Sequence, residues 1–411
     1  MSKFKKFFFK LILFVFVIIN ARFSLAQDSV NSISNQGIYK DIVNESNQNI
    51  VIRPTPSMTH HLVMDLNLDN NFQATNNNSE FKESLLNARY FNKIFLTDKF
   101  SVNSFFRLID EENQRNIWQS SQYNGKNRYF SDLRLELHEI NLRYNYQNKK
   151  KKFNNNLLFG KFDLGFATAW RWDRGLSIHK LAENYKQTKK FGVSDILKIG
   201  NSKKTGEYNL GLSLFSDFSS AFGDANSNGN PGETRALKSI NFTTDINFDF
   251  AKEEKLSYHF SYLNLAVDGH KSLVRPTKIA DQKGFAYAMR YQYPIDEKII
   301  IDGLLEYTKI NNFLGDSDRL QSYLNSNILL RYNKSWSLLL GNVRHKNRNV
   351  NAVGFNQNHS EISVGYEFKD TKYFDKLTIQ LGYHHNRLSY LNQQVTKNGS
   401  YGFLVRYYKN F

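Results

Sequence analysis

Adjacent histidines are the residues of this sequence that most resemble metal ligands, and they occur as His60-His61 and His384-His385. Both pairs fall in stretches where apolar and polar residues alternate, which predicts β-strands. Neighbouring side chains of a strand point to opposite faces of its sheet, so neither pair can hold one ion between its two rings. The chain also contains no cysteine, which excludes thiolate metal sites and cysteine nucleophiles. We therefore expect no metal and no cofactor.

Hydrolase chemistry is not favoured by the sequence either. No Gly-x-Ser-x-Gly element and no His-Glu-x-x-His motif occurs. Ser257 and His259 share one face of an expected strand, but serine and histidine are frequent enough for such a pair to arise by chance. We expect a protein that is not an enzyme.

Charged residues collect in the longest expected loop, residues 166–192. Basic residues exceed acidic ones there, and the candidates for a pore constriction are Arg171, Asp173, Arg174, Lys180, Glu183 and Lys186. If this loop enters a channel, its positive charges would favour anions, since lysine and arginine side chains arranged around a pore select anionic solutes. The alternative is a solvated loop whose charges do nothing specific.

Further charges fall on the polar phase of the expected strands, which would face a channel. They are Arg290, Arg331, Arg406, Asp245, Asp249, Asp302 and Glu306. Basic and acidic groups on opposing walls would set a transverse electric field across the channel. The alternative is that these charges pair with one another and keep the lumen wet.

Strands with one apolar and one polar face must position these groups. In residues 240–250, Ile240, Phe242, Ile246 and Phe248 alternate with amides and carboxylates, and residues 256–262 repeat the pattern. A period of two indicates a strand rather than a helix. Aromatic residues make up 15% of the chain and gather near the ends of such runs, as in an interfacial aromatic girdle.

Sixteen such runs are expected, and their connections alternate in length. The runs are 58–69, 81–95, 100–109, 131–146, 153–165, 193–200, 206–216, 238–250, 255–266, 284–293, 297–309, 320–332, 335–346, 358–369, 374–387 and 400–411. Connections of about two to six residues alternate with longer ones of about ten to twenty-seven, which is how outer-membrane barrels are built. In run 131–146 the apolar phase slips between Leu137 and Ile140, which predicts a β-bulge.

The fold class follows from the chemistry of the bilayer. Mean hydropathy is −0.55, which excludes a bundle of membrane-spanning helices. In hydrocarbon every backbone N–H and C=O needs an internal partner, so a sheet with an apolar outer band must close on itself. We predict an all-β protein, a single transmembrane antiparallel up-and-down barrel with about sixteen strands, short periplasmic turns and long extracellular loops.

The first residues predict export. Lys3, Lys5 and Lys6 precede an apolar run at 11–19, and Ser24-Leu25-Ala26 provides small residues before a cleavage site. We expect a signal peptide at 1–26, a polar periplasmic segment at 27–57 and the barrel at 58–411. The alternative is an N-terminal membrane anchor.

The last run resembles the C-terminal strand of Gram-negative outer-membrane proteins. It alternates aromatic and apolar residues on one face and ends in phenylalanine: Tyr401, Phe403, Val405, Tyr407 and Phe411. In that family the barrel assembly machinery reads this strand. With the leader and the strand rhythm, the sequence resembles the outer-membrane porin family. That resemblance implies that the loop at 166–192 folds inward to constrict the pore, and that the chain forms a homotrimer.

Function is therefore expected to be passive diffusion of small hydrophilic solutes through the bacterial outer membrane, with a weak anion preference. The alternative is a closed or plugged barrel with a structural, glycan-binding or adhesive role. Arg344, Lys346 and Arg348 follow an expected strand and would either bind the phosphates of lipopolysaccharide or form a generic basic loop. No nucleic-acid partner is expected, although the net charge is +17.

Overall fold

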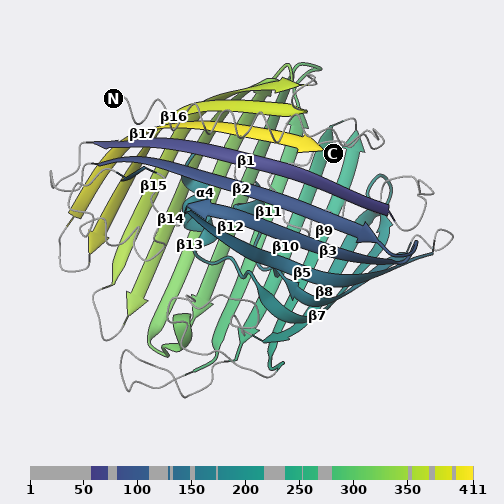
Figure 1. The fold of residues 1–411 in the computed structure, drawn as a ribbon. Helices are drawn as coiled ribbons and strands as arrows, with labels where there is room; N and C mark the ends of the chain where they lie inside the picture. Colours follow the sequence, from purple (N-terminus) through teal and green to yellow (C-terminus); the bar gives the residue numbers. More distant parts are fainter. Residues whose placement is uncertain are drawn as a thin grey trace.

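The computed structural model describes residues 57–72, 81–110, 128–129, 133–148, 153–172, 175–216, 237–251, 253–266, 280–349, 354–369, 375–390 and 395–410. Within them the chain forms sixteen long antiparallel strands and one two-residue strand, closed into a barrel (Figure 1). Among these residues no helix is long and apolar enough to cross a membrane.

The strands follow one another around the barrel in chain order. The first half consists of β1 (Ser57–Phe72), β2 (Phe81–Phe95), β3 (Phe100–Asp110), β4 (Arg128–Tyr129), β5 (Leu133–Asn148), β6 (Phe153–Phe162), β7 (Lys190–Asn201), β8 (Gly206–Ser216) and β9 (Ser239–Ala251). The second half consists of β10 (Glu254–Leu265), β11 (Gln282–Pro294), β12 (Ile299–Asn311), β13 (Arg319–Tyr332), β14 (Trp336–Asn349), β15 (Phe355–Lys369), β16 (Lys376–Tyr390) and β17 (Val395–Asn410). The short β4 pairs in parallel with β2 at its edge.

The barrel closes where β17 pairs with β1, from His61 opposite Asn410 to Phe72 opposite Gly399. The last strand therefore hydrogen-bonds to the first, and the ring of strands is closed. The start of β1 and the end of β17 lie at the same end of the barrel as the turns at 96–99 and 202–205, which we call the turn end. The opposite end is the loop end.

The expected strand rhythm is confirmed, and so is the bulge in β5. Phe105 pairs with Glu139 while its neighbour Phe106 pairs with Leu137, so His138 is the extra residue. The expectation of long connections throughout the loop end was wrong for the second half of the chain. The connections 312–318, 350–354 and 391–394 are short because β13 to β17 extend further toward the loop end than the sequence pattern indicated.

The two faces of the wall differ as the alternation predicts. On β9, Phe242 points outward and is 38% exposed, whereas Asn241 and Thr243 point inward and are 1% exposed. Outward positions of other strands carry similarly exposed apolar side chains, including Leu212, Leu214, Phe260, Tyr287, Ile328 and Leu340. An exposed apolar outer wall around a polar interior is the pattern of a barrel that spans a lipid bilayer.

The terminal strand has the expected face. Tyr401, Phe403, Val405 and Tyr407 alternate along β17 on the outward side, and Tyr401 is 60% exposed. Phe411 and the whole of residues 1–56, with the expected signal peptide and polar segment, lie outside the described residues. Recognition of this strand by the assembly machinery stays a prediction.

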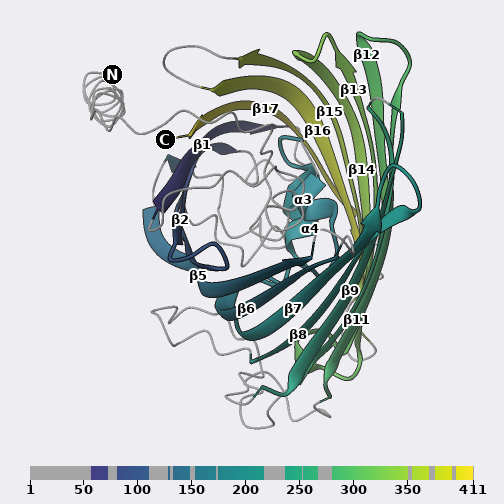
Figure 2. The ribbon, with the colours of Figure 1, turned by 90° about the vertical axis from the view of Figure 1, so that its right-hand side faces the viewer.

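The largest apolar cluster lies inside the barrel rather than in its wall. The segment between β6 and β7 carries two short helices, α3 (Ala169–Trp172) and α4 (Ile178–Glu183). Figure 2 looks into the barrel and shows α3 and α4 within the ring of strands. Phe166 and Tyr185 of this segment pack in one cluster with inward residues of the strands, among them Ala286 on β11, Ile310 on β12 and Tyr323 on β13.

Candidate functional site

The segment 163–189, which we call the inward loop, is the main feature of the lumen. It leaves the wall at the end of β6 and returns at the start of β7, and its helices contact β12, β14 and β15. The expected loop at 166–192 thus corresponds to this segment, shifted because β6 ends at Phe162 and β7 begins at Lys190. Two buried carboxylates on the opposite wall hold it there.

Glu306 on β12 forms the first clamp. Its carboxylate accepts hydrogen bonds from the backbone N–H groups of Thr168 (2.5 Å) and Ala169 (2.8 Å) and from the hydroxyl of Tyr185 (2.6 Å). Ala167, with φ of 59°, turns the chain in the left-handed region just before these donors, and its N–H donates to Ser261. A carboxylate with several N–H and O–H donors keeps its charge satisfied in a buried place.

Glu361 on β15 forms the second clamp. It accepts the backbone N–H groups of Leu176 (2.6 Å), Ser177 (2.9 Å) and Ile178 (2.9 Å) at the start of α4. His359, on the same strand, lies 2.9 Å from the hydroxyl of Ser177 through its Nε2. Glu306 is 1% exposed and Glu361 is 4% exposed, so both clamps are sealed from water. Together they pin the middle of the inward loop to the β12–β15 wall.

The base of the inward loop is held by ionic contacts that depend on the bulge in β5. The extra residue turns both His138 and Glu139 inward, where they are 2% and 1% exposed. Asp163 lies 3.1 Å from His138 Nε2 and accepts the backbone N–H of Lys189 at 3.0 Å. Burial alone would raise the pKa of Asp163, but His138 and Lys186 outweigh it and hold that pKa well below its usual range.

His138, Glu139 and Asp163 are also the group of described residues best arranged to hold a metal ion, with ligand atoms within 4.8 Å of one another. Two observations disfavour a cation there. Asp163 already contacts His138, and the ammonium group of Lys186 lies 3.8 Å from the same carboxylate. The arrangement therefore fits an ion-pair network that fixes the two ends of the inward loop.

Arginines line another part of the wall, on β17, β2 and β3, which begins two strands beyond the second clamp. Arg89 on β2 and Arg406 on β17 both contact Asp65 on β1, each at 2.6 Å. Arg107 on β3 is the direct cross-strand neighbour of Arg89 and donates to Asn87 at 3.1 Å. We call Arg89, Arg107 and Arg406 with Asp65 the arginine wall. Because it has three guanidinium groups and one carboxylate, the arginine wall carries excess positive charge. The side chains of Arg89 and Arg406 are 16% and 21% exposed.

Two residues of the inward loop lie within electrostatic range of this wall: Glu183 of Arg89, and Lys186 of Arg107. Burial lowers the pKa of Lys186, and Asp163 and Glu183 oppose that shift without cancelling it. The ammonium group of Lys186 also lies over the Trp170 ring, 4.4 Å from its centroid.

The other constriction candidates occupy different places. Arg171 is 4% exposed, stacks on Trp170 at 4.5 Å and donates to the carbonyl of Leu164 at 3.0 Å, so it packs within the inward loop. Asp173 and Arg174 lie outside the described residues, and only the backbone of Lys180 is described. Of the predicted residues whose side chains the structure describes, Glu183 and Lys186 lie within electrostatic range of the arginine wall.

The predicted lumen charges are mostly paired with neighbours on the same side. Arg290 contacts Asp302 at 2.5 Å, and Arg331 lies 3.7 Å from the same carboxylate. Asp245 lies 2.6 Å from His259, and Asp249 accepts the hydroxyl of Ser202 at 2.6 Å near the turn end. These pairs are local, whereas Arg406 belongs to the arginine wall and Glu306 to a clamp.

Several functional residues were missed by the sequence analysis. Glu361, like Glu306, occupies a lumen-facing position of its strand, but it was not singled out. The available signal was a carboxylate in the middle of a strand. Arg89 was missed because both phases of β2 mix apolar and polar residues: Leu85 and Phe91 face inward with it. Arg107 was missed because the buried Phe105 shares its phase on β3. The strand period therefore does not show which side faces water.

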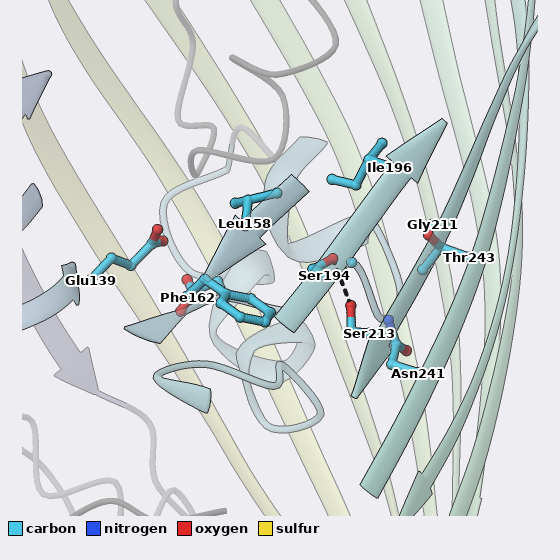
Figure 3. A pocket seen from close by; sticks show the side chains of 11 residues that line it. Glu139, Leu158, Phe162, Ser194, Ile196, Gly211, Ser213, Asn241 and Thr243 are labelled. Carbon is cyan, nitrogen blue, oxygen red and sulfur yellow. Dashed lines mark hydrogen bonds between the residues drawn. The ribbon is translucent and has the colours of Figure 1, made fainter. Parts of the chain in front are cut away.

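A small pocket lies beside the base of the inward loop (Figure 3). Its lining comes from β5 to β9 and the inward loop and includes Glu139, Phe162, Asn241 and the hydrogen-bonded pair Ser194 and Ser213, whose hydroxyl oxygens are 2.8 Å apart. It is large enough for about one water molecule, so it is not a path for solutes.

No protein-family model matches the sequence, and no curated protein matches it either. Solved structures share the fold. A loop-deletion mutant of OmpT, an outer membrane protein of Vibrio cholerae, matches with a TM-score of 0.50 and 10% identity over 86% of this chain and 99% of that one. The outer membrane channel DcaP of Acinetobacter baumannii matches with a TM-score of 0.48 and 11% identity over 86% and 96%. An anion-selective porin from Comamonas acidovorans matches with a TM-score of 0.46 and 10% identity over 86% and 99%. The first of these shows that the chain has the fold of an outer-membrane β-barrel.

Proposed function

We propose that this protein is an outer-membrane porin through which small hydrophilic solutes diffuse passively, with a preference for anions. The observation that carries the proposal is the division of the lumen. The inward loop is clamped to the β12–β15 wall by Glu306 and Glu361, and the arginine wall occupies the stretch from β17 to β3. A solute path would run between Lys186 and Glu183 on the loop and Arg89 and Arg107 on the wall.

Barrel size supports a water-filled path, because about sixteen strands enclose more space than wall side chains fill. The inward loop narrows that space to a constriction. Solutes would pass it by diffusion, with no covalent reaction. Partly exposed arginines in a narrow, low-dielectric passage raise the local concentration of anions and lower that of cations.

Planar-bilayer recording of the purified, folded protein tests the proposal. We expect stepwise currents of constant size and, in a salt gradient, a reversal potential shifted toward the equilibrium potential of the anion. A correctly folded barrel that passes no current would contradict the porin proposal and favour a closed, surface-binding barrel. Steady current without an ionic preference would remove only the anion selectivity.

A further inference from the structure

The adjacent histidines of β16, His384 and His385, belong to opposite faces of the barrel wall, as expected for neighbours in a strand. His385 shares the outward phase of Leu381, which is 59% exposed. His384 shares the inward phase and pairs across β15 and β16 with Glu361, the carboxylate of the second clamp. A group whose charge changes near neutral pH therefore stands directly beside the clamp.

Two carboxylates flank His384. Glu361 lies opposite it on β15, and Asp69 on β1 places its Oδ1 atom 4.0 Å from His384 Nε2. Glu361 and Asp69 are 4% and 8% exposed, and the side chain of His384 is 15% exposed. A positive charge on His384 would thus be attracted by two buried negative charges, one on each neighbouring part of the wall.

Gly402 on β17 lets Asp69 reach this place. β17 lies between β16 and β1 in the sheet, and a Cβ at Gly402 would be 2.7 Å from Asp69 Oδ1 and 3.1 Å from Leu176 Cδ1. The space of the missing side chain is taken by Asp69 and by Leu176, whose backbone N–H donates to Glu361. Asp69 thus meets the inward loop just before α4, at the residues that the second clamp holds.

His359 completes this group. Its ring centroid is 5.3 Å from that of His384, and its Nε2 lies 2.9 Å from the hydroxyl of Ser177. Because that hydroxyl donates to Glu361 at 3.2 Å, His359 donates through Nε2 and keeps this contact whether or not its ring carries a second proton. Two charged rings this close repel each other, so the first added proton is stabilised most at His384, between the two carboxylates.

The other strand positions beside the two rings are uncharged. Val343 and Asn386 lie opposite His359, and Ser400 lies opposite His384. Further titratable residues of the elements packed here are Glu83, which is opposite Asp69 on β2, and His179, Lys180 and Glu183 on α4. Glu183 lies within electrostatic range of Arg89, and the side chains of the other three lie outside the described residues.

We propose that His384 is a proton-dependent latch for the inward loop. Its imidazolium form, between Glu361 and Asp69, holds the second clamp closed in mildly acidic solution, and the neutral ring holds it less firmly. With the loop seated, these charges are shielded from water and attract strongly, whereas water screens them once the loop is released. A proton that binds the seated arrangement more tightly stabilises that arrangement as pH falls through the range where histidine titrates, and the gain is lost as pH rises again.

The first clamp provides an internal reference. Glu306 is held by Thr168, Ala169 and Tyr185 rather than by a histidine, so its grip on the loop should not follow the same pH profile. The latch concerns how the loop is seated in the barrel, so it does not depend on whether the lumen conducts.

Hydrogen exchange tests the latch, because the donors of both clamps are backbone N–H groups. Folded protein in detergent is exchanged at about pH 7.5 and about pH 5.5, on either side of the ordinary titration of histidine. Mass spectrometry follows peptides that cover residues 176–178 and 168–169. After the intrinsic pH dependence of amide exchange is divided out, we expect protection at 176–178 to rise about tenfold at the lower pH and protection at 168–169 to stay constant.

His384→Asn should remove the rise at 176–178. The matched control is His385→Asn, which makes the same change at the next residue on the outward face and should keep the rise. A rise of equal size in His384→Asn overturns the proposal, and so does its loss in His385→Asn. If His384→Asn does not fold, wild type decides: protection that changes equally at the two clamps, or at neither, contradicts the latch.

Discussion

The two sides of the lumen use charge in opposite ways. On the clamped side, Glu306 and Glu361 are almost completely buried, and their oxygens accept backbone N–H groups of the inward loop. On the arginine wall, Arg89 and Arg406 share one carboxylate and remain partly exposed. A lumen-facing charge whose hydrogen bonds are all taken up by protein holds structure, whereas one left partly in water can act on solutes.

Removing the clamps should have the largest effect. In Glu306→Gln/Glu361→Gln each carboxylate that accepts several donors becomes an amide with one acceptor oxygen, and every buried N–H left without a partner costs about 1–3 kcal/mol. The inward loop should detach, giving larger and noisier single-channel currents in planar bilayers.

The control for this variant is Glu367→Gln, which makes the same chemical change on β15 but nearer the turn end. It should conduct as wild type does. Unchanged current steps in the double clamp variant would show that the inward loop does not restrict the path.

Neutralising the arginine wall should change selectivity rather than conductance. Arg89→Gln/Arg107→Gln removes two positive charges next to the proposed path, so the anion-to-cation permeability ratio should fall several-fold in dilute salt. The difference should shrink as salt rises, because the screening length falls from about 30 Å at 0.01 M to about 3 Å at 1 M. Reversal potentials at several salt concentrations measure this.

Lys203→Gln/Lys204→Gln serves as a control, since it removes the same charge from an exposed turn. If both double variants shift the reversal potential equally, the selectivity comes from overall charge and the arginine wall has no special part in it.

Alkaline pH should weaken the anion preference by a smaller amount. Burial lowers the pKa of Lys186, so in the folded protein this residue loses its proton at a lower pH than the usual value of about 10.4. As pH rises toward that value, the path loses one positive charge while ordinary lysines keep theirs. Reversal potentials between neutral and alkaline pH should show this decline in wild type and lack it in Lys186→Gln. A decline of the same size in Lys186→Gln would assign it to another group.

A methyl group under the clamped loop should give the smallest effect. A Cβ at Gly382 would lie 2.5 Å from Ser363 Cβ and 2.8 Å from Leu176 Cδ1, so Gly382→Ala should destabilise the folded barrel by about 1–3 kcal/mol. At Gly303, on the outward face of β12, the nearest atom is 3.9 Å away, and Gly303→Ala should change stability by less than about 0.5 kcal/mol. Denaturant unfolding in detergent compares the two. Equal stability of both variants would show that Leu176 is not held closely against β16.

Much of the wall could be predicted from the sequence, because lipid imposes an apolar residue at every second position. The phase slip between Leu137 and Ile140 even located the bulge at His138. The path of the inward loop depends on individual contacts such as those of Glu361. Such contacts leave no repeating pattern in the sequence. Arg171 shows the same limit, since its charge suggested a pore residue whereas its contacts with Trp170 and Leu164 are internal to the loop.

Single-cysteine accessibility tests the central claim, that water follows the arginine wall and not the clamped side. The chain has no cysteine, so Arg107→Cys and Thr308→Cys each introduce one thiol, and Thr308 is 0% exposed on the inward face of β12. We predict that a cationic thiol reagent added during bilayer recording reduces the current and shifts the reversal potential in Arg107→Cys, and has no effect in Thr308→Cys. Modification of Thr308→Cys with no response from Arg107→Cys would contradict this account.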